Sequence, residues 1–144
     1  MTPDERLAAL VAGEDPKMVA ELPSGFVVMG DNQVLPGYCL LLAYPKAGHL
    51  LELDPEDQAI FLADMALLGQ AVQEVTGAVR CNFAIYGNLD PFLHAHVWPR
   101  YPDEPEEQRT RPPLAFPRSI EPVAWSEEVH GEIRDALRDA LQSD

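Results

Sequence analysis

One long amphipathic helix between residues 54 and 77 constrains the fold of this chain most. Asp54 and Pro55 are typical N-cap and first-turn residues, and Gly77 supplies a C-terminal stop. Between them, apolar residues recur in steps of four, three, four and three and so form one stripe: Phe61, Met65, Leu68, Val72 and Val75. A helix with a single apolar stripe buries it against another element, so we expect this helix to pack on a sheet.

Short apolar runs on both sides of this helix supply the strands of that sheet. A Pro-Ser-Gly turn joins the first two runs, and the third is continuously apolar, as in a central strand. The last run alternates and is expected to stop at a proline. The runs cover residues 17–22, 26–29, 38–44, 79–86 and 93–98. Strands joined by short turns predict an α+β fold, with a five-stranded antiparallel sheet, one long helix and a C-terminal helix.

The length and composition fit a single domain over residues 1–144, because a chain of this size with 47% hydrophobic residues buries one core. We expect a core over about residues 15–101, a proline- and charge-rich loop or arm at 102–122, and a C-terminal helix over 126–142. Ser126 would cap that helix, and Thr2 a short helix over 3–12. The expected buried edge of the C-terminal helix is Val129, Ile133, Leu137 and Leu141.

The formal net charge of −14 argues against binding to a nucleic-acid backbone, which requires a basic face. A small anionic ligand remains compatible, because the field inside a pocket can oppose the net charge. No apolar run approaches the ~20 residues of a membrane span, and the N-terminus does not have the pattern of a secretory leader. We therefore expect a cytoplasmic protein that contacts neither nucleic acid nor membrane, with Cys39 and Cys81 as reduced thiols.

The segment Leu93–Arg100 carries two histidines two residues apart. Because residues i and i+2 of a strand share a face, His94 and His96 project together. Three interpretations are open. They are core histidines, or two ligands of a metal site completed by His49, His130 or an acidic residue. Alternatively, one imidazole attacks a phosphorus atom while the other binds the phosphate or assists the leaving group.

The segment Gly87–Tyr101 (GNLDPFLHAHVWPRY) resembles the motif of the histidine triad (HIT) family, in particular its bacterial diadenosine tetraphosphate hydrolase-like branch. Residues 31–38 resemble the family's nucleotide-pocket strand and turn, and residues 45–49 the segment leading into its long helix. The resemblance covers about residues 25–101. It implies a HIT-like fold, a homodimer, and a nucleotidyl hydrolase or transferase acting on dinucleoside polyphosphates (Ap4A-like) or other AMP conjugates.

The chain departs from the family pattern His-x-His-x-His at its first position, where it has Phe92. The resemblance makes His94 the nucleophile that forms a covalent nucleotidyl-histidine intermediate. It makes His96 the contact to the phosphate and leaving group. In the family, the backbone carbonyl at the Phe92 position orients the nucleophile's ring. Phenylalanine still provides that carbonyl, so we expect activity to survive.

The resemblance also suggests substrate-binding residues. Asn88 matches the family's amide that holds ribose or phosphate, and Asn82 takes that role under another placement of the gap. The alternatives are turn chemistry for Asn88 and a structural role for Asn82. Asp31 or Asn32 would meet the ribose hydroxyls, with a simple hairpin turn as the equally economical explanation.

Arg100 would attract the outer phosphates of a polyphosphate or pair with Asp90. Arg109 and Arg111 would reach over the polyphosphate in a dimer or neutralise the acidic run at 103–107. No metal or cofactor is expected on the protein, although Mg²⁺ could accompany a polyphosphate as a counter-ion. The alternative function is a nucleotide-binding sensor or partner protein with little or no turnover.

Overall fold

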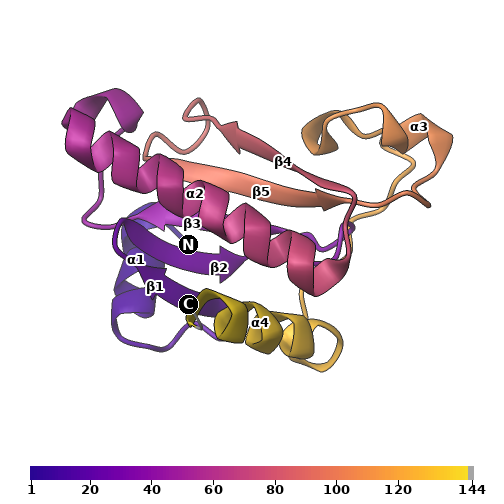
Figure 1. Cartoon of the computed structure of the whole chain (residues 1–144), viewed down its shortest axis with the longest axis horizontal. Helices are drawn as coiled ribbons and strands as arrows, with labels where there is room; N and C mark the ends of the chain where they lie inside the picture. Colours follow the sequence, from indigo (N-terminus) through magenta and orange to yellow (C-terminus); the bar gives the residue numbers. More distant parts are fainter. Residues whose placement is uncertain (143–144) are drawn as a thin grey trace.

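The computed structural model describes residues 1–142 as one antiparallel sheet with helices on both faces (Figure 1). The five strands follow the order β1-β2-β3-β5-β4 across the sheet. Their bounds are β1 Met18–Leu22, β2 Gly25–Met29, β3 Cys39–Ala43, β4 Arg80–Ile85 and β5 His94–Arg100. The predicted α+β class, the five strands and the central position of the third strand are confirmed.

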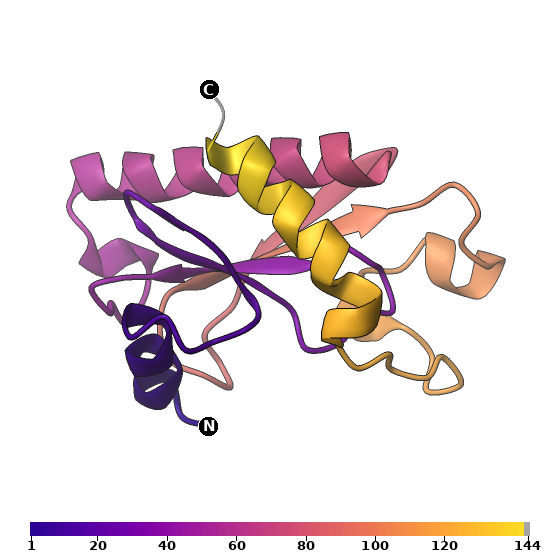
Figure 2. The same cartoon turned by 90° about the horizontal axis from the view of Figure 1, so that it is seen from below.

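Helix α2, Pro55–Thr76, covers one face of the sheet, as its stripe predicts. The Asp54 carboxylate accepts a hydrogen bond from the backbone N–H of Asp57, and Gly77 ends the helix with a φ of 74°, in the left-handed region that favours glycine. Phe61, Leu68 and Val72 are fully buried, and Met65 and Val75 pack against the same core. Figure 2 shows α2 on one side of the sheet and the N-terminal helix on the other.

Helix α4, Glu127–Gln142, lies on the same face and contacts α2 and β1. The prediction that Val129 belongs to its buried edge is wrong, because this side chain is 66% exposed. His130 is buried instead, with an exposure of 3%, and its Nδ1 accepts a hydrogen bond from the backbone N–H of Ser126. The buried edge thus begins one residue later, at a spacing of seven from Leu137.

Strand β5 continues through Pro99 to Arg100, so the prediction that this strand stops at the proline is wrong. Its pairing with β3 ends at Val97, and Pro99 pairs only with Cys81 of β4. Proline is tolerated where one side of a strand has no neighbour to receive its missing N–H.

Both cysteines are free thiols, as expected.

Helix α1, Pro3–Val11, lies on the opposite face from α2 and begins with a capping box between Thr2 and Glu5. Leu7 and Leu10 pack with residues of the sheet and with Phe92 in a small second core. The segment 102–122 contains one short helix, α3 (Glu106–Arg109), and a 3₁₀ turn, η2 (Pro113–Ala115), and is otherwise irregular. A second 3₁₀ turn, η1 (Leu50–Glu52), precedes α2. None of the helices within residues 1–142 is long and apolar enough to span a membrane.

Candidate functional site

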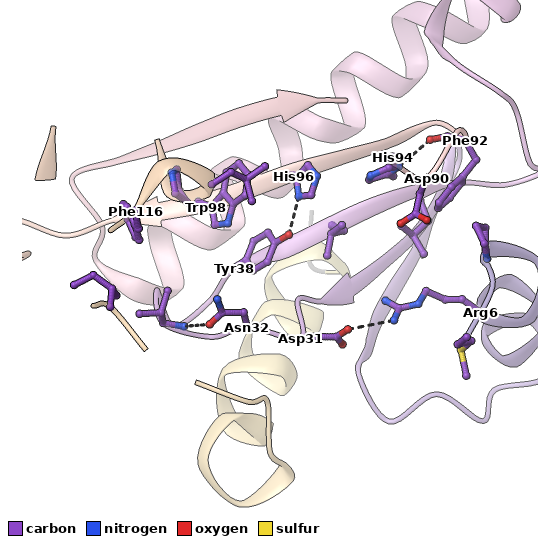
Figure 3. A pocket seen from close by; sticks show the side chains of 18 of the residues that line it. Arg6, Asp31, Asn32, Tyr38, Asp90, Phe92, His94, His96, Trp98 and Phe116 are labelled. Carbon is purple, nitrogen blue, oxygen red and sulfur yellow. Dashed lines mark hydrogen bonds and ion pairs between the residues drawn. The ribbon is translucent and has the colours of Figure 1, made fainter. Parts of the chain in front are cut away.

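The two histidines of β5 project from the face of the sheet that carries α1. His94 pairs with Leu42 of β3 and His96 with Leu40, so both rings stand over the centre of the sheet. Their ring centroids are 5.2 Å apart and the planes meet at 70°. Both line a cavity of about 520 Å³ (Figure 3). The predicted common face of His94 and His96 is therefore present, and it opens on a space large enough for a small-molecule ligand.

A backbone carbonyl fixes the orientation of His94. Its Nδ1 lies 2.8 Å from the carbonyl oxygen of Phe92 (Figure 3). A carbonyl oxygen only accepts hydrogen bonds, so Nδ1 must carry the proton in this contact. In the neutral ring, Nε2 then holds the free electron pair, which is what a nucleophile or a base requires. The Phe92 ring also stacks on the His94 ring at 4.8 Å.

His96 is held by aromatic neighbours. The Trp98 ring lies parallel to it, at 4.8 Å between centroids and 3° between planes. The Tyr38 hydroxyl lies 2.7 Å from Nδ1 of His96 (Figure 3). Burial, reinforced by the neighbouring His94, lowers the pKa of His96 to about 4. The His96 ring is therefore neutral at neutral pH.

The other walls of the cavity come from segments far apart in the chain. Helix α1 and the residues before it form one wall, and the stretch around η2 forms another. The apolar lining includes Val34, Leu40, Leu42, Leu114, Phe116 and Ile120, and the polar lining includes Arg6, Asp31, Asn32, Asp90 and Arg118. The cavity thus combines an apolar part with a few charged groups around the histidines, as ligand pockets commonly do.

Asp31 and Asn32, which the family resemblance suggested for ribose binding, both line the cavity. The Asp31 carboxylate pairs with Lys17 at 2.6 Å and with Arg6 at 3.4 Å. Burial acts to raise the pKa of Asp31, but the hydrogen bond and charge of Lys17, together with Arg6, outweigh it and lower the pKa. The side-chain oxygen of Asn32 accepts hydrogen bonds from the backbone N–H groups of Val34 and Val123. Asn32 therefore also stabilises the local turn, which was the alternative explanation offered by the sequence.

Asn88 and Asn82 do not line the histidine cavity. Asn88 is exposed in the connection between β4 and β5. Asn82 lies on β4 and lines a second hollow, which is formed by the start of β4 and by residues between 100 and 112. Its side-chain oxygen accepts a hydrogen bond from Arg100 at 2.8 Å. This contact gives Asn82 the structural role that was its alternative.

Arg100 does not face the cavity, and its expected pairing with Asp90 is absent. The side chain is buried and makes two hydrogen bonds to the Glu104 carboxylate, at 3.0 and 2.8 Å. Its remaining N–H groups meet Asn82 and the backbone carbonyls of Gln108, Arg109 and Arg111. The sequence predicted that Arg100 follows the histidine strand, whereas it is the last residue of β5. Its side chain anchors the segment 104–111 and has no N–H left for a phosphate. Arg109 and Arg111 line the second hollow beside it.

Sequence reasoning missed four residues that shape this site: Arg6, Tyr38, Trp98 and Phe116. Trp98 could have been found, because it lies two residues after His96 on the same face of the strand. Predicting Tyr38 would require the register between β3 and β5. Predicting Arg6 and Phe116 would require the placement of segments distant in the chain. No local sequence pattern encodes these long-range positions.

No group of three or more metal-ligating side chains is present within residues 1–142. His49 and His130, the candidate further ligands, lie elsewhere. Nδ1 of His49 accepts a hydrogen bond from the backbone of Leu51 at η1, and His130 is buried in α4.

The fold of the chain is similar to that of solved histidine triad proteins. Those from Bradyrhizobium japonicum, Sinorhizobium meliloti and Marinobacter aquaeolei are 24%, 23% and 25% identical to this chain, with TM-scores of 0.74, 0.75 and 0.75. The matches cover 87%, 95% and 96% of this chain and 91%, 94% and 93% of those chains. No protein-family model and no curated protein matches the chain by sequence. The predicted HIT-like fold is confirmed, whereas the particular branch of the family is not distinguished.

Proposed function

We propose that this chain is a histidine triad nucleotidyl hydrolase or transferase that acts through a covalent intermediate on His94. The proposed substrates are dinucleoside polyphosphates such as Ap4A, or other conjugates of AMP. The observation that carries this proposal is the contact between Nδ1 of His94 and the Phe92 carbonyl. It directs the free electron pair of His94 to Nε2, on a ring that lines a cavity beside a second, neutral imidazole.

The proposed reaction has two steps. Nε2 of His94 attacks the α-phosphorus of the nucleotide; a P–N bond forms, and the P–O bond to the leaving group breaks with its electron pair on the departing oxygen. Water, or another acceptor in a transferase, then attacks the same phosphorus and loses a proton to solvent. The P–N bond breaks and the nucleoside monophosphate leaves. In this proposal His96, whose ring lies 5.2 Å from that of His94, holds a phosphate oxygen in both steps.

The cavity has parts suited to each portion of a nucleotide. Its apolar walls offer a surface for a base, and the carboxylate of Asp31 or the amide of Asn32 offers polar groups for ribose hydroxyls. The solved structure of a Sulfolobus tokodaii protein, 16% identical with a TM-score of 0.72, is described as that of a hypothetical histidine triad nucleotide-binding protein. That description supports a nucleotide as the class of ligand proposed here.

The test is a chromatographic product assay with Ap4A, with and without a chelator. We expect AMP and ATP from the wild type in both conditions, and no products from His94→Ala. The matched control is His49→Asn, because His49 is exposed at η1 and asparagine can accept the same backbone hydrogen bond. Turnover by His94→Ala would refute the assignment of His94 as the nucleophile.

Two other outcomes would change the assignment. Tight nucleotide binding without products over hours would favour a nucleotide-binding sensor or partner protein. A Mycobacterium smegmatis histidine triad protein of similar fold (21% identity, TM-score 0.66) is described as Zn-bound. Loss of turnover in the chelator, restored by one transition metal, would therefore indicate a metal-dependent enzyme. It would refute our proposal that the protein itself needs no metal or cofactor.

We also propose a cytoplasmic homodimer that binds neither nucleic acid nor membrane. Strand β4 is an open edge of the sheet, and its Phe83 is 44% exposed. The Phe83 ring packs against Gly69 of α2. Leu62 lies about two turns earlier on the same face of that helix and is 39% exposed. An unpaired edge with exposed apolar side chains is suited to a second copy. Sedimentation analysis should give the mass of two chains, and the mass of one chain would refute the homodimer.

A further inference from the structure

The hydroxyl of Tyr38, the residue immediately before β3, faces the histidine pair. The tyrosine is 8% exposed, and its ring stacks on Trp98 at 5.0 Å between centroids. Within residues 1–142, Nδ1 of His96 is the only hydrogen-bond partner of this hydroxyl, at 2.7 Å. Backbone register makes the contact possible, because His96 pairs with Leu40 and Tyr38 lies two residues earlier on the same face.

Burial raises the pKa of Tyr38 well above its ordinary value, so the phenol keeps its proton at neutral pH. That proton has one acceptor available within the described residues, the ring nitrogen of His96. If Nδ1 of His96 carried a proton, the two hydrogens would compete for one contact and the hydroxyl proton would have no acceptor among residues 1–142. Donation from Tyr38 to Nδ1 satisfies both groups.

From this geometry we infer that Tyr38 is a positioning residue that fixes His96 with its proton on Nε2, the tautomer opposite to that of His94. The two rings then have different roles in the reaction, and this assignment of roles rests on the proposed function. His94 is held by a carbonyl that accepts, so its Nε2 has a free electron pair for phosphorus. His96 is held by a hydroxyl that donates, so its Nε2–H is a donor for a phosphoryl oxygen.

This arrangement specifies what His96 contributes. A neutral imidazole with its proton on Nε2 donates a hydrogen bond readily, but giving that proton away would leave an imidazolate. His96 therefore stabilises charge on the phosphate oxygens and does not act as the proton donor to the leaving group. The inference suits leaving groups that depart as stable anions, such as the polyphosphate end of a nucleotide, and disfavours those that must be protonated first.

The first experiment measures the imidazole nitrogens directly, in ¹⁵N-labelled protein without substrate. At neutral pH we expect Nε2 protonated and Nδ1 unprotonated for His96, and the reverse for neutral His94. Tyr38→Phe should shift the His96 nitrogens towards a mixture of tautomers. The matched control is Tyr44→Phe, since Tyr44 is 39% exposed and lies outside the cavity. A proton on Nδ1 of His96 in the wild type, or no change in Tyr38→Phe, would overturn the inference.

The second experiment uses turnover and separates positioning from folding. Tyr38→Phe should lower the turnover number about tenfold, the loss expected for one hydrogen bond in the transition state. In a His96→Ala background the same substitution should have no further effect, because Tyr38 acts through His96. An equal loss in both backgrounds would mean a merely structural role. If the wild type turns over no nucleotide, the proposed function fails, while the nitrogen measurement still decides the role of Tyr38.

Discussion

The indole of Trp98 lies parallel to the imidazole of His96, with the two ring planes 3° apart. Trp98 also packs with Leu35 and Tyr38 in a small buried cluster beside the cavity. One side chain therefore joins the packing of this face to the orientation of a histidine in the candidate site.

Trp98→Ala should lower the free energy of unfolding by about 3–5 kcal/mol, because it leaves a cavity in this cluster. It should also lower nucleotide turnover, since His96 loses its stacking partner. Trp98→Phe keeps an aromatic face and should retain more of both properties. Denaturant unfolding and the Ap4A assay check these expectations; full turnover in the alanine variant would show that the stacking does not position His96.

The low pKa of His96 predicts how stability depends on pH. The folded-state value of about 4 is below the ordinary 6.5, so between these values the unfolded chain binds a proton that the folded chain does not. The contribution of His96 is complete above about pH 6.5 and falls as the pH drops towards 4. An NMR titration of the His96 ring should give a midpoint near 4, and denaturant unfolding of His96→Asn should show a weaker pH dependence over this range. A midpoint at the ordinary value would contradict the prediction.

Arg100→Met should lower the free energy of unfolding by about 3–5 kcal/mol, because it leaves the buried Glu104 carboxylate without its partner. The guanidinium also lies 5.3 Å from the Phe116 ring, so the wall of the cavity formed by that residue should loosen. Arg109→Met, at an exposed position next to the same hollow, should change stability by no more than about 0.5 kcal/mol. Unchanged stability with weakened nucleotide binding in Arg100→Met would instead restore the phosphate role expected from sequence.

Phe92→His places the family's first histidine in this chain. The backbone carbonyl that holds His94 remains, so turnover should stay close to that of the wild type. The imidazole would replace a phenyl ring packed among Leu7, Leu10 and Leu42, which should cost about 1–3 kcal/mol in stability. Phe92→Leu keeps the site apolar and should cost less than about 1.5 kcal/mol. A large gain in turnover in Phe92→His would show that the side chain at this position, and not only its carbonyl, contributes to the reaction.

The elements with local patterns were predictable, and the contacts between distant segments were not. The stripe of α2 and its Asp54 and Gly77 ends are encoded by neighbours in the sequence, as is the shared face of His94 and His96. The direction in which the Arg100 side chain points depends on the backbone carbonyl groups of residues 108–111, and no local sequence pattern gives their positions. The burial of His130 in place of Val129 depends on the rotation of α4 against α2 and β1, which tertiary packing sets.

The cavity wall formed by the first residues of the chain has a practical consequence for work with this protein. Met1, Thr2 and Pro3 line the cavity, and the N-terminus lies on the α1 side of the sheet (Figure 2). Helix α4, whose described part ends at Gln142, lies on the opposite face. An affinity tag attached before Met1 would therefore begin beside the space that a ligand needs, and we expect it to lower the measured affinity. Binding experiments should therefore use a C-terminal tag or a cleaved N-terminus.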